Sequence, residues 1–206
     1  MSQIVKDILE SRKNQKIIRT ISTEFKARED ESEPTIEGYF AVFNSTYDMG
    51  WGMHETIAPG AFTKALSDDV RALFNHDTNL VLGRNTAHTL ELRQDEYGLW
   101  GKIRINPKDS DAMNAYERIK RGDVSGCSFG FDIIDEETEY RDDGTIHFTI
   151  REVKLYEVSP CTFPAYQSTS ITARNRATYE ELQKRSLNAW KNKMTNRLKG
   201  VAENGT

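Results

Sequence analysis

The sequence predicts an α+β protein whose central part is a mostly antiparallel β domain. Short runs in which apolar and polar residues alternate recur across residues 36–159, and turn residues separate them. Only residues 106–122 have a clear helical pattern. These are more strands than a helix bundle allows and too few helices for alternating β-α units.

Composition excludes several classes of protein. The 206 residues are 37% hydrophobic, 10% aromatic and 29% charged, which is polar for a globular chain but too aromatic for full disorder. The formal net charge of −4 gives no nucleic-acid footprint. No apolar run is long enough to span a membrane, and the charged N-terminus lacks the apolar core of a secretory signal. Two cysteines make no disulfide scaffold, so we expect a reducing compartment.

Changes in composition divide the chain into three parts. Residues 26–35 are charged and poor in apolar side chains, so we expect residues 1–35 to be a tail and linker. Residues 36–172 form the folded domain, and residues 173–206 form a C-terminal tail. That tail carries apolar residues spaced as in an amphipathic helix, which are Leu187, Trp190, Met194, Leu198 and Val201. This stripe suits docking or self-association, or packing on the chain's own domain.

The first half of the domain combines strands with a long loop. Residues 36–44 are rich in aromatic and β-branched side chains and predict a strand. Residues 45–55 contain two glycines and predict a loop. Residues 57–66 predict a turn that leads into a short helix, because a proline lies near its start. Residues 70–76 and 80–84 predict two further strands.

A hairpin and a helix follow. Residues 88–94 and 99–105 both alternate around a glycine-containing turn, which is typical of an antiparallel hairpin. Residues 106–122 predict the clearest helix, because apolar residues share one face and Asp109 or Ser110 can cap its first turn.

The last part of the domain predicts a second hairpin. Residues 123–134 form a strand candidate, and residues 146–159 supply one or two more. Between them, Asp143 and Gly144 form the strongest short turn signal in the chain.

Residues 122–131 are the best candidate for a nucleophile. Small residues are crowded inside this apolar strand, and a nucleophile needs an open backbone so that a carbonyl can approach it. The same pattern also suits a β-bulge or a tight packing contact. Ser128 and Cys127 are the two candidates, and strand geometry sends them to opposite faces. A buried apolar thiol is the preferred interpretation of Cys127.

Ser128 needs a neighbouring base and a third group that orients it. His76 is the natural base, because it stands at a strand end, where catalytic groups are often held. A surface histidine would give the same pattern. Candidates for the third group are Glu157, Asp77, His147 and Glu152. Glu157 lies between apolar residues of a strand, so a buried partner is implied for its carboxylate.

The sequence gives no metal site. The four histidines are scattered, and no pair of cysteine and histidine residues has the spacing of zinc ligands. The four histidines are His54, His76, His88 and His147.

Seven motifs in order resemble the prohead maturation proteases of tailed bacteriophages, a family similar in fold to the herpesvirus assembly proteases. They cover about residues 36–166 and read EGYFAVFN, HETIAPGAF, VRALFNHD, LVLG, GLWGKIRI, GDVSGCSFGF and LYEVSPCTFPA. The resemblance implies a β-barrel-like core with a few flanking helices. It also implies a serine endopeptidase that needs no cofactor and no metal.

The resemblance assigns roles to three residues. The family's histidine falls on His76, its serine on Ser128, and its acid on Glu157, with His147 as the alternative third member because the herpesvirus relatives use a second histidine. The departure from the family pattern is Cys127, where an aliphatic residue is more usual.

The resemblance further implies where the protein acts and on what. The substrates would be scaffold segments, the N-terminal segment of the major capsid protein, and the protease itself. Cleavage would take place inside the procapsid, in the bacterial host cytoplasm. A homo-oligomer is possible, and neither nucleic acid nor membrane is expected as a partner. Two other hypotheses stay open, a catalytically silent scaffold protein with the protease fold and a cysteine hydrolase that uses Cys127.

Overall fold

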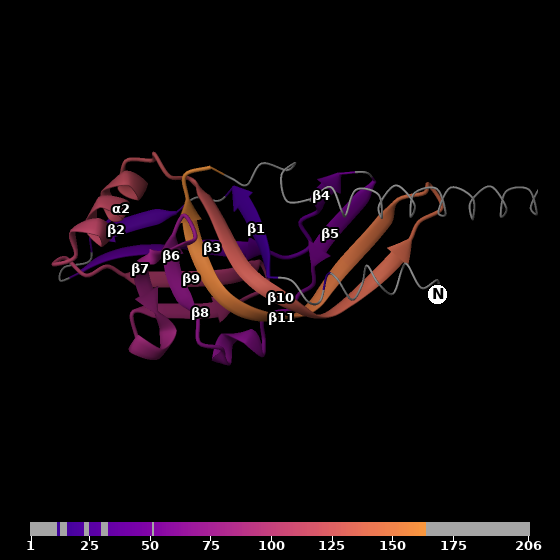
Figure 1. Ribbon diagram of the computed structural model, residues 1–206, viewed down its shortest axis with the longest axis horizontal. Helices are drawn as coiled ribbons and strands as arrows, with labels where there is room; N and C mark the ends of the chain where they lie inside the picture. Colours follow the sequence, from indigo (N-terminus) through magenta and orange to yellow (C-terminus); the bar gives the residue numbers. More distant parts are fainter. Residues whose placement is uncertain (1–11, 13–15, 23–24, 30–32, 51, 164–206) are drawn as a thin grey trace, which may run out of the picture.

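The structure is a computed structural model, and its two β-sheets carry most of the described residues (Figure 1). It describes residues 12, 16–22, 25–29, 33–50 and 52–163. The amphipathic stripe expected in residues 173–206 lies outside the described residues.

The larger sheet contains the strands that hold the candidate residues. Along its main path the order is β1 (Ile17–Ser22), β10 (Gly126–Tyr140), β11 (Ile146–Cys161), β5 (Met53–Ile57) and β4 (Tyr47–Gly50). Two more strands, β6 (Arg71–Phe74) and β7 (Asp77–Arg84), join through β11. The smaller sheet has the order β2 (Lys26–Glu29), β3 (Pro34–Val42), β9 (Gly98–Arg104) and β8 (Leu90–Gln94).

The central element of the larger sheet is the long hairpin of β10 and β11. Its turn contains Gly144 at φ 86°, as the Asp143 and Gly144 pair predicts. One edge of β11 pairs with β10, whereas the other edge pairs in parallel with β5 near its start and with β6 near its end. In Figure 1 this hairpin runs through the body and extends beyond it. One strand therefore positions groups from distant parts of the chain.

The hydrophobic core lies between the two sheets. Alternate residues of β10, Cys127, Phe129 and Phe131, are fully buried, and the Cys127 thiol donates to the carbonyl of Tyr39 on β3 at 3.0 Å. The rings of Phe129 and Phe131 stack with centroids 4.9 Å apart. Because side chains alternate along a strand, Ser128 and Gly130 face the opposite side of the sheet.

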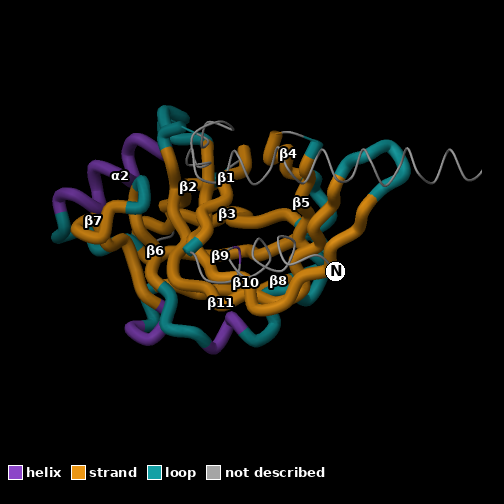
Figure 2. The backbone as a smooth tube through the Cα atoms, turned by 45° about the vertical axis from the view of Figure 1, so that its right-hand side comes forward, coloured by secondary structure: helices purple, strands orange, loops and turns teal. Residues whose placement is uncertain are grey.

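One α-helix is present in the described part of the chain. It is α2 (Ser110–Lys120) at one end of the body, and Asp109 caps it by accepting from the N–H groups of Asp111 and Ala112 (Figure 2). The short helix expected in residues 57–66 is reduced to a 3₁₀ turn, η1 (Ala65–Ser67), because tight turns occupy the residues before it. A second 3₁₀ turn is η2 (Asn85–Ala87). No helix among the described residues is long and apolar enough to cross a membrane.

Three expectations differ from the structure. The sheets are not closed into a barrel, because β1 and β4 end the path of the larger sheet and no pairing between described residues joins them. The loop expected at residues 45–55 holds the short strands β4 and β5, which turn at glycines with positive φ. The segment 26–35, expected to be a linker, supplies β2 and the start of β3. The hairpin of β8 and β9 and the α2 helix are as predicted.

Candidate active site

His76 is held in a tight turn between β6 and β7. Asn75 and His76 are the two residues of this turn, and both have positive φ, 54° and 61°. Positive φ at both central positions is the requirement of a type I′ hairpin turn, and Asn and His tolerate it better than most residues. The turn therefore places the imidazole at the edge of the larger sheet.

A set of hydrogen bonds ties this turn to the end of β11. The backbone N–H of Asn75 donates to the carbonyl of Pro160 at 3.0 Å. The Asn75 side chain accepts from the N–H of Thr162 at 2.9 Å and donates to the Thr162 hydroxyl at 3.2 Å. The amide of Asn75 thus fixes where His76 lies relative to β11.

Glu157 on β11 is the partner of His76. Its Oε1 lies 2.7 Å from the imidazole Nδ1, and its Oε2 accepts from the Ser159 hydroxyl at 2.6 Å. The Glu157 side chain is 2% exposed, so its charge depends on these two partners. Because this contact uses Nδ1, Nε2 is the ring nitrogen that can accept a proton, as a general base requires.

Gly130 leaves the space that the Glu157 carboxylate occupies. The two residues face each other in the pairing of β10 with β11, next to an irregularity in the register. A Cβ atom at position 130 would lie 2.5 Å from Glu157 Oε1. Gly130, the second glycine of the SGCSFG motif, is therefore needed because any larger residue would fill the space of the Glu157 carboxylate on the neighbouring strand.

Ser128 lies on the same face of the sheet but its hydroxyl contacts β1. It is fully buried, pairs with Ser159 of β11 on one side and faces Thr20 of β1 on the other. Its Oγ donates to the carbonyl of Arg19 at 2.8 Å and accepts from the Thr20 hydroxyl at 3.1 Å. Among the described residues, no hydrogen bond joins Ser128 with His76.

Cys161 occupies the position next to the imidazole Nε2. Its Sγ lies 3.5 Å from that nitrogen and 3.5 Å from the carbonyl of Ser159. Burial, and then the nearby charge of Glu157, raise the pKa of this thiol to about 12. Cys161 is therefore a neutral thiol at physiological pH.

The other sequence candidates lie away from this site. His147 contacts the Thr56 hydroxyl at the start of β11, ten residues before Glu157 and so about 30 Å away along the strand. Asp77 accepts from the backbone N–H of Asn79, and Glu152 pairs with the Lys64 ammonium. Of the four acids and histidines considered, the structure brings only Glu157 to His76.

Cys127 faces the core, away from His76. Its thiol contacts carbonyls of β3, and burial raises its pKa well above the usual value. A thiolate is the reactive form of cysteine, so this environment disfavours Cys127 as a nucleophile.

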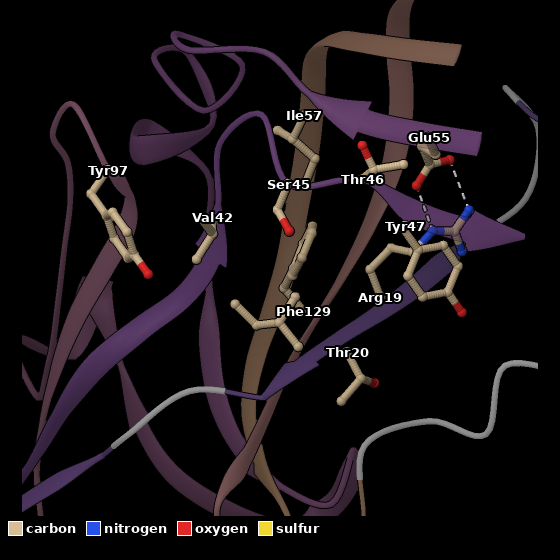
Figure 3. Close-up of a pocket in the computed structure, with 11 residues that line it drawn as sticks. Arg19, Thr20, Val42, Ser45, Thr46, Tyr47, Glu55, Ile57, Tyr97 and Phe129 are labelled. Carbon is tan, nitrogen blue, oxygen red and sulfur yellow. Dashed lines mark hydrogen bonds and ion pairs between the residues drawn. The ribbon is translucent and has the colours of Figure 1, made fainter. Parts of the chain in front are cut away.

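A pocket borders β1 on the face opposite Ser128, and neither His76 nor Glu157 lines it (Figure 3). Glu55 lies there, 1% exposed, with its Oε1 2.5 Å from Arg19 Nε and its Oε2 2.7 Å from Arg12 Nη2. Burial would raise the pKa of Glu55, but the two guanidinium groups outweigh burial and lower it. Within the described residues, no three His, Cys, Asp or Glu side chains cluster closely enough to hold a metal ion.

Comparison with known proteins decides the family. A family model described as "Caudovirus prohead serine protease" matches residues 21–185, which is most of the chain. The chain belongs to this family. The region that matches the family model contains His76, Ser128 and Glu157.

Individual relatives agree. The chain is 34% identical over 164 residues to the prohead protease of Enterobacteria phage HK97, an alignment that covers 76% of this chain and 68% of that protein. It is 31% identical over 99 residues to the prohead protease of Escherichia phage T5, covering 48% and 43%. The solved bacteriophage T4 capsid assembly protease aligns with a TM-score of 0.46 and 14% identity, covering 71% of this chain and 97% of that one.

Several residues of the candidate site and of the pocket beside β1 were not found from the sequence. Cys161 and Ser159 lie within the LYEVSPC motif, but nothing in their spacing shows that they contact His76 and Glu157. Asn75, next to His76, carries a usable signal, because Asn favours the positive φ of such turns. Arg19 and Glu55 are 36 positions apart, and only the fold brings them together.

We predict that Gly130→Ala lowers activity more than stability. The added methyl group displaces the Glu157 carboxylate, which is the movable end of a side chain, and the His76 contact is lost. A displacement of about 1 Å at such a site costs ~100-fold in rate. The measurement is kcat beside the thermal unfolding midpoint.

Gly98→Ala is the matched control. There the added Cβ would collide with the backbone carbonyl of Ala41 on β3, which has no such freedom. We expect this variant to lose about 1–3 kcal/mol of stability. Equal losses of stability in the two variants would contradict the role given to Gly130.

A second prediction concerns the anchor of the His76 turn. Asn75→Gly keeps the positive φ but removes both side-chain hydrogen bonds to Thr162. We expect kcat to fall about tenfold or more with KM little changed, because only the position of His76 shifts. Unchanged kcat in steady-state kinetics would mean that Asn75 does not position the imidazole.

Proposed function

We propose that His76, Ser128 and Glu157 are the catalytic triad of a capsid-maturation endopeptidase. The observation that supports this proposal most directly is the 2.7 Å contact of His76 Nδ1 with Glu157 Oε1. The position of Ser128 supports the proposal as well, because Ser128 lies on the same face of the sheet as Gly130, the residue opposite Glu157. All three residues fall in the region that matches the prohead protease family.

In this mechanism the Ser128 hydroxyl leaves β1 and turns to the imidazole. Glu157 accepts a hydrogen bond from Nδ1–H, so Nε2 carries the lone pair and accepts the Ser128 proton while Oγ attacks a peptide carbonyl. The protonated His76 then donates to the leaving amine. Water hydrolyses the acyl-enzyme with the same base, so the cycle needs no metal or cofactor.

The substrates we propose are proteins of the immature capsid. The relatives are named prohead proteases or a capsid assembly protease. By analogy we assign to this chain the cleavage of scaffold segments, of the N-terminal segment of the major capsid protein, and of itself. We place the reaction inside the procapsid in the host cytoplasm.

The test is intact mass spectrometry of the protein co-expressed with its cognate capsid protein. We expect truncated capsid and protease masses with the wild type and none with Ser128→Ala, since removal of a triad nucleophile costs at least ~10³-fold in rate. Processing by Ser128→Ala at the wild-type rate would refute the assignment of the nucleophile.

Cysteine variants serve as matched controls. Cys161 lies beside His76 Nε2, the nitrogen that accepts the Ser128 proton in the proposed mechanism. Cys127 is the alternative nucleophile that the sequence suggested. We expect both Cys161→Ala and Cys127→Ala to keep processing the capsid protein. Loss of cleavage in either variant, with the fold intact, would favour a thiol nucleophile instead.

A further inference from the structure

The strand β1 covers the proposed nucleophile completely. Its six residues pair antiparallel with residues 126–131 of β10, and Thr20 stands opposite Ser128. β1 is also the first strand on the path of the larger sheet, so just one of its edges is paired with another described strand. In Figure 1 it lies alongside β10. An edge strand of this kind occupies the place where an extended peptide adds to a sheet.

The contact between β1 and Ser128 has the chemistry of a bound peptide. The carbonyl oxygen of Arg19 accepts the Ser128 hydroxyl at 2.8 Å, so a peptide carbonyl of the chain lies at the nucleophile. The Thr20 hydroxyl donates to the Ser128 Oγ at 3.1 Å. Both bonds direct the Ser128 hydroxyl toward β1, and a substrate cannot reach it while β1 is in place.

The attachment of β1 depends on a buried charge as well as on pairing. Arg19 places Nε and Nη2 on the two oxygens of Glu55, at 2.5 and 2.8 Å. Arg12, earlier in the same N-terminal segment, adds a third bond to Glu55 at 2.7 Å. Figure 3 shows the Arg19 side chain reaching Glu55 at the wall of the pocket.

A departing β1 would take both Arg19 bonds away from the buried Glu55 carboxylate and leave it the single bond from Arg12. Removing partners from a buried charge is destabilising, so a replacement for β1 is favoured when it brings a cation to the place of Arg19. The match to the family begins at residue 21, so most of β1 lies outside the region that this chain shares with the family model.

We propose that β1 is an internal occupant of the peptide-binding site, which must leave β10 before Ser128 acts, and that its replacement is an extended peptide whose Arg or Lys side chain contacts Glu55. This inference rests on the proposed protease function where it says that Ser128 acts after β1 has left. The covering strand and the site for a basic side chain are properties of binding, and they are testable without catalysis.

The first experiment measures access to position 128 with a thiol probe. The full chain carrying Ser128→Cys is treated with iodoacetamide, which alkylates an accessible thiol. The same chain is treated after adding Ile21→Lys, which puts a charge at a β1 residue packed against the core. The matched control is Ile18→Lys on the same strand, where the side chain is 40% exposed. We expect Ile21→Lys to raise the alkylation rate at position 128 at least tenfold and Ile18→Lys to leave it unchanged.

The native thiol of Cys161 reports on unfolding in the same spectra, because it is buried with a pKa raised to about 12. Its continued protection shows that only β1 was released. If Ile21→Lys exposes Cys161, Arg19→Gln replaces it as the variant that weakens β1. Equal alkylation at position 128 with and without the weakened strand would overturn the proposal.

The second experiment tests the chemistry of the replacing peptide. The peptide KIIRTIS, which repeats residues 16–22, is added to the chain carrying Ser128→Cys and Arg19→Gln. We expect it to slow alkylation at position 128 at least fivefold, whereas the same peptide with glutamate in place of arginine does not. Equal protection by the two peptides would refute the role of Glu55.

A fluorophosphonate probe then separates this inference from the proposed function. With Ser128 present, we expect Ile21→Lys to be labelled at least tenfold faster than the wild type. If the thiol and peptide results hold but Ser128 is not labelled, β1 is a covering strand and the serine protease assignment of Ser128 fails.

Discussion

The pairing register of β10 with β11 is the constraint on which the site depends. It sets Gly130 opposite Glu157 and Ser128 opposite Ser159, so that a glycine makes room for a buried carboxylate and a serine lies two residue pairs away on the same face. A shift by one residue would turn Ser128 into the core and bring Cys127 to the site. The same strand β11 receives the His76 turn through Pro160 and Thr162.

Buried charge governs the two ends of this region in different ways. Glu157 has a histidine and a hydroxyl as partners, so its environment orients a base. Glu55 has two guanidinium groups from the N-terminal segment, so its environment attaches a strand. Under the two proposals above, the first environment prepares the base and the second keeps the nucleophile covered.

The periodic elements were predictable because their patterns are local. The two hairpins and α2 follow from alternation, turn residues and an N-cap, all of which are visible within about 20 residues. The barrel-like closure was wrong because strand patterns do not state which edges pair. The strands β1, β2, β4 and β5 were missed because they are only four to six residues long, and because β1 and β5 pair with strands far along the chain.

The sequence alone determined the family and the types of residue that its chemistry needs, since seven ordered motifs carry His76, Ser128 and Glu157. It left open whether Glu157 or His147 stands beside His76, and only the fold places Glu157 there, because β11 is long enough to keep the two residues far apart. Tertiary structure also decided that β1 lies on Ser128. Pairing between segments more than 100 residues apart depends on edges and buried charges that no local pattern encodes.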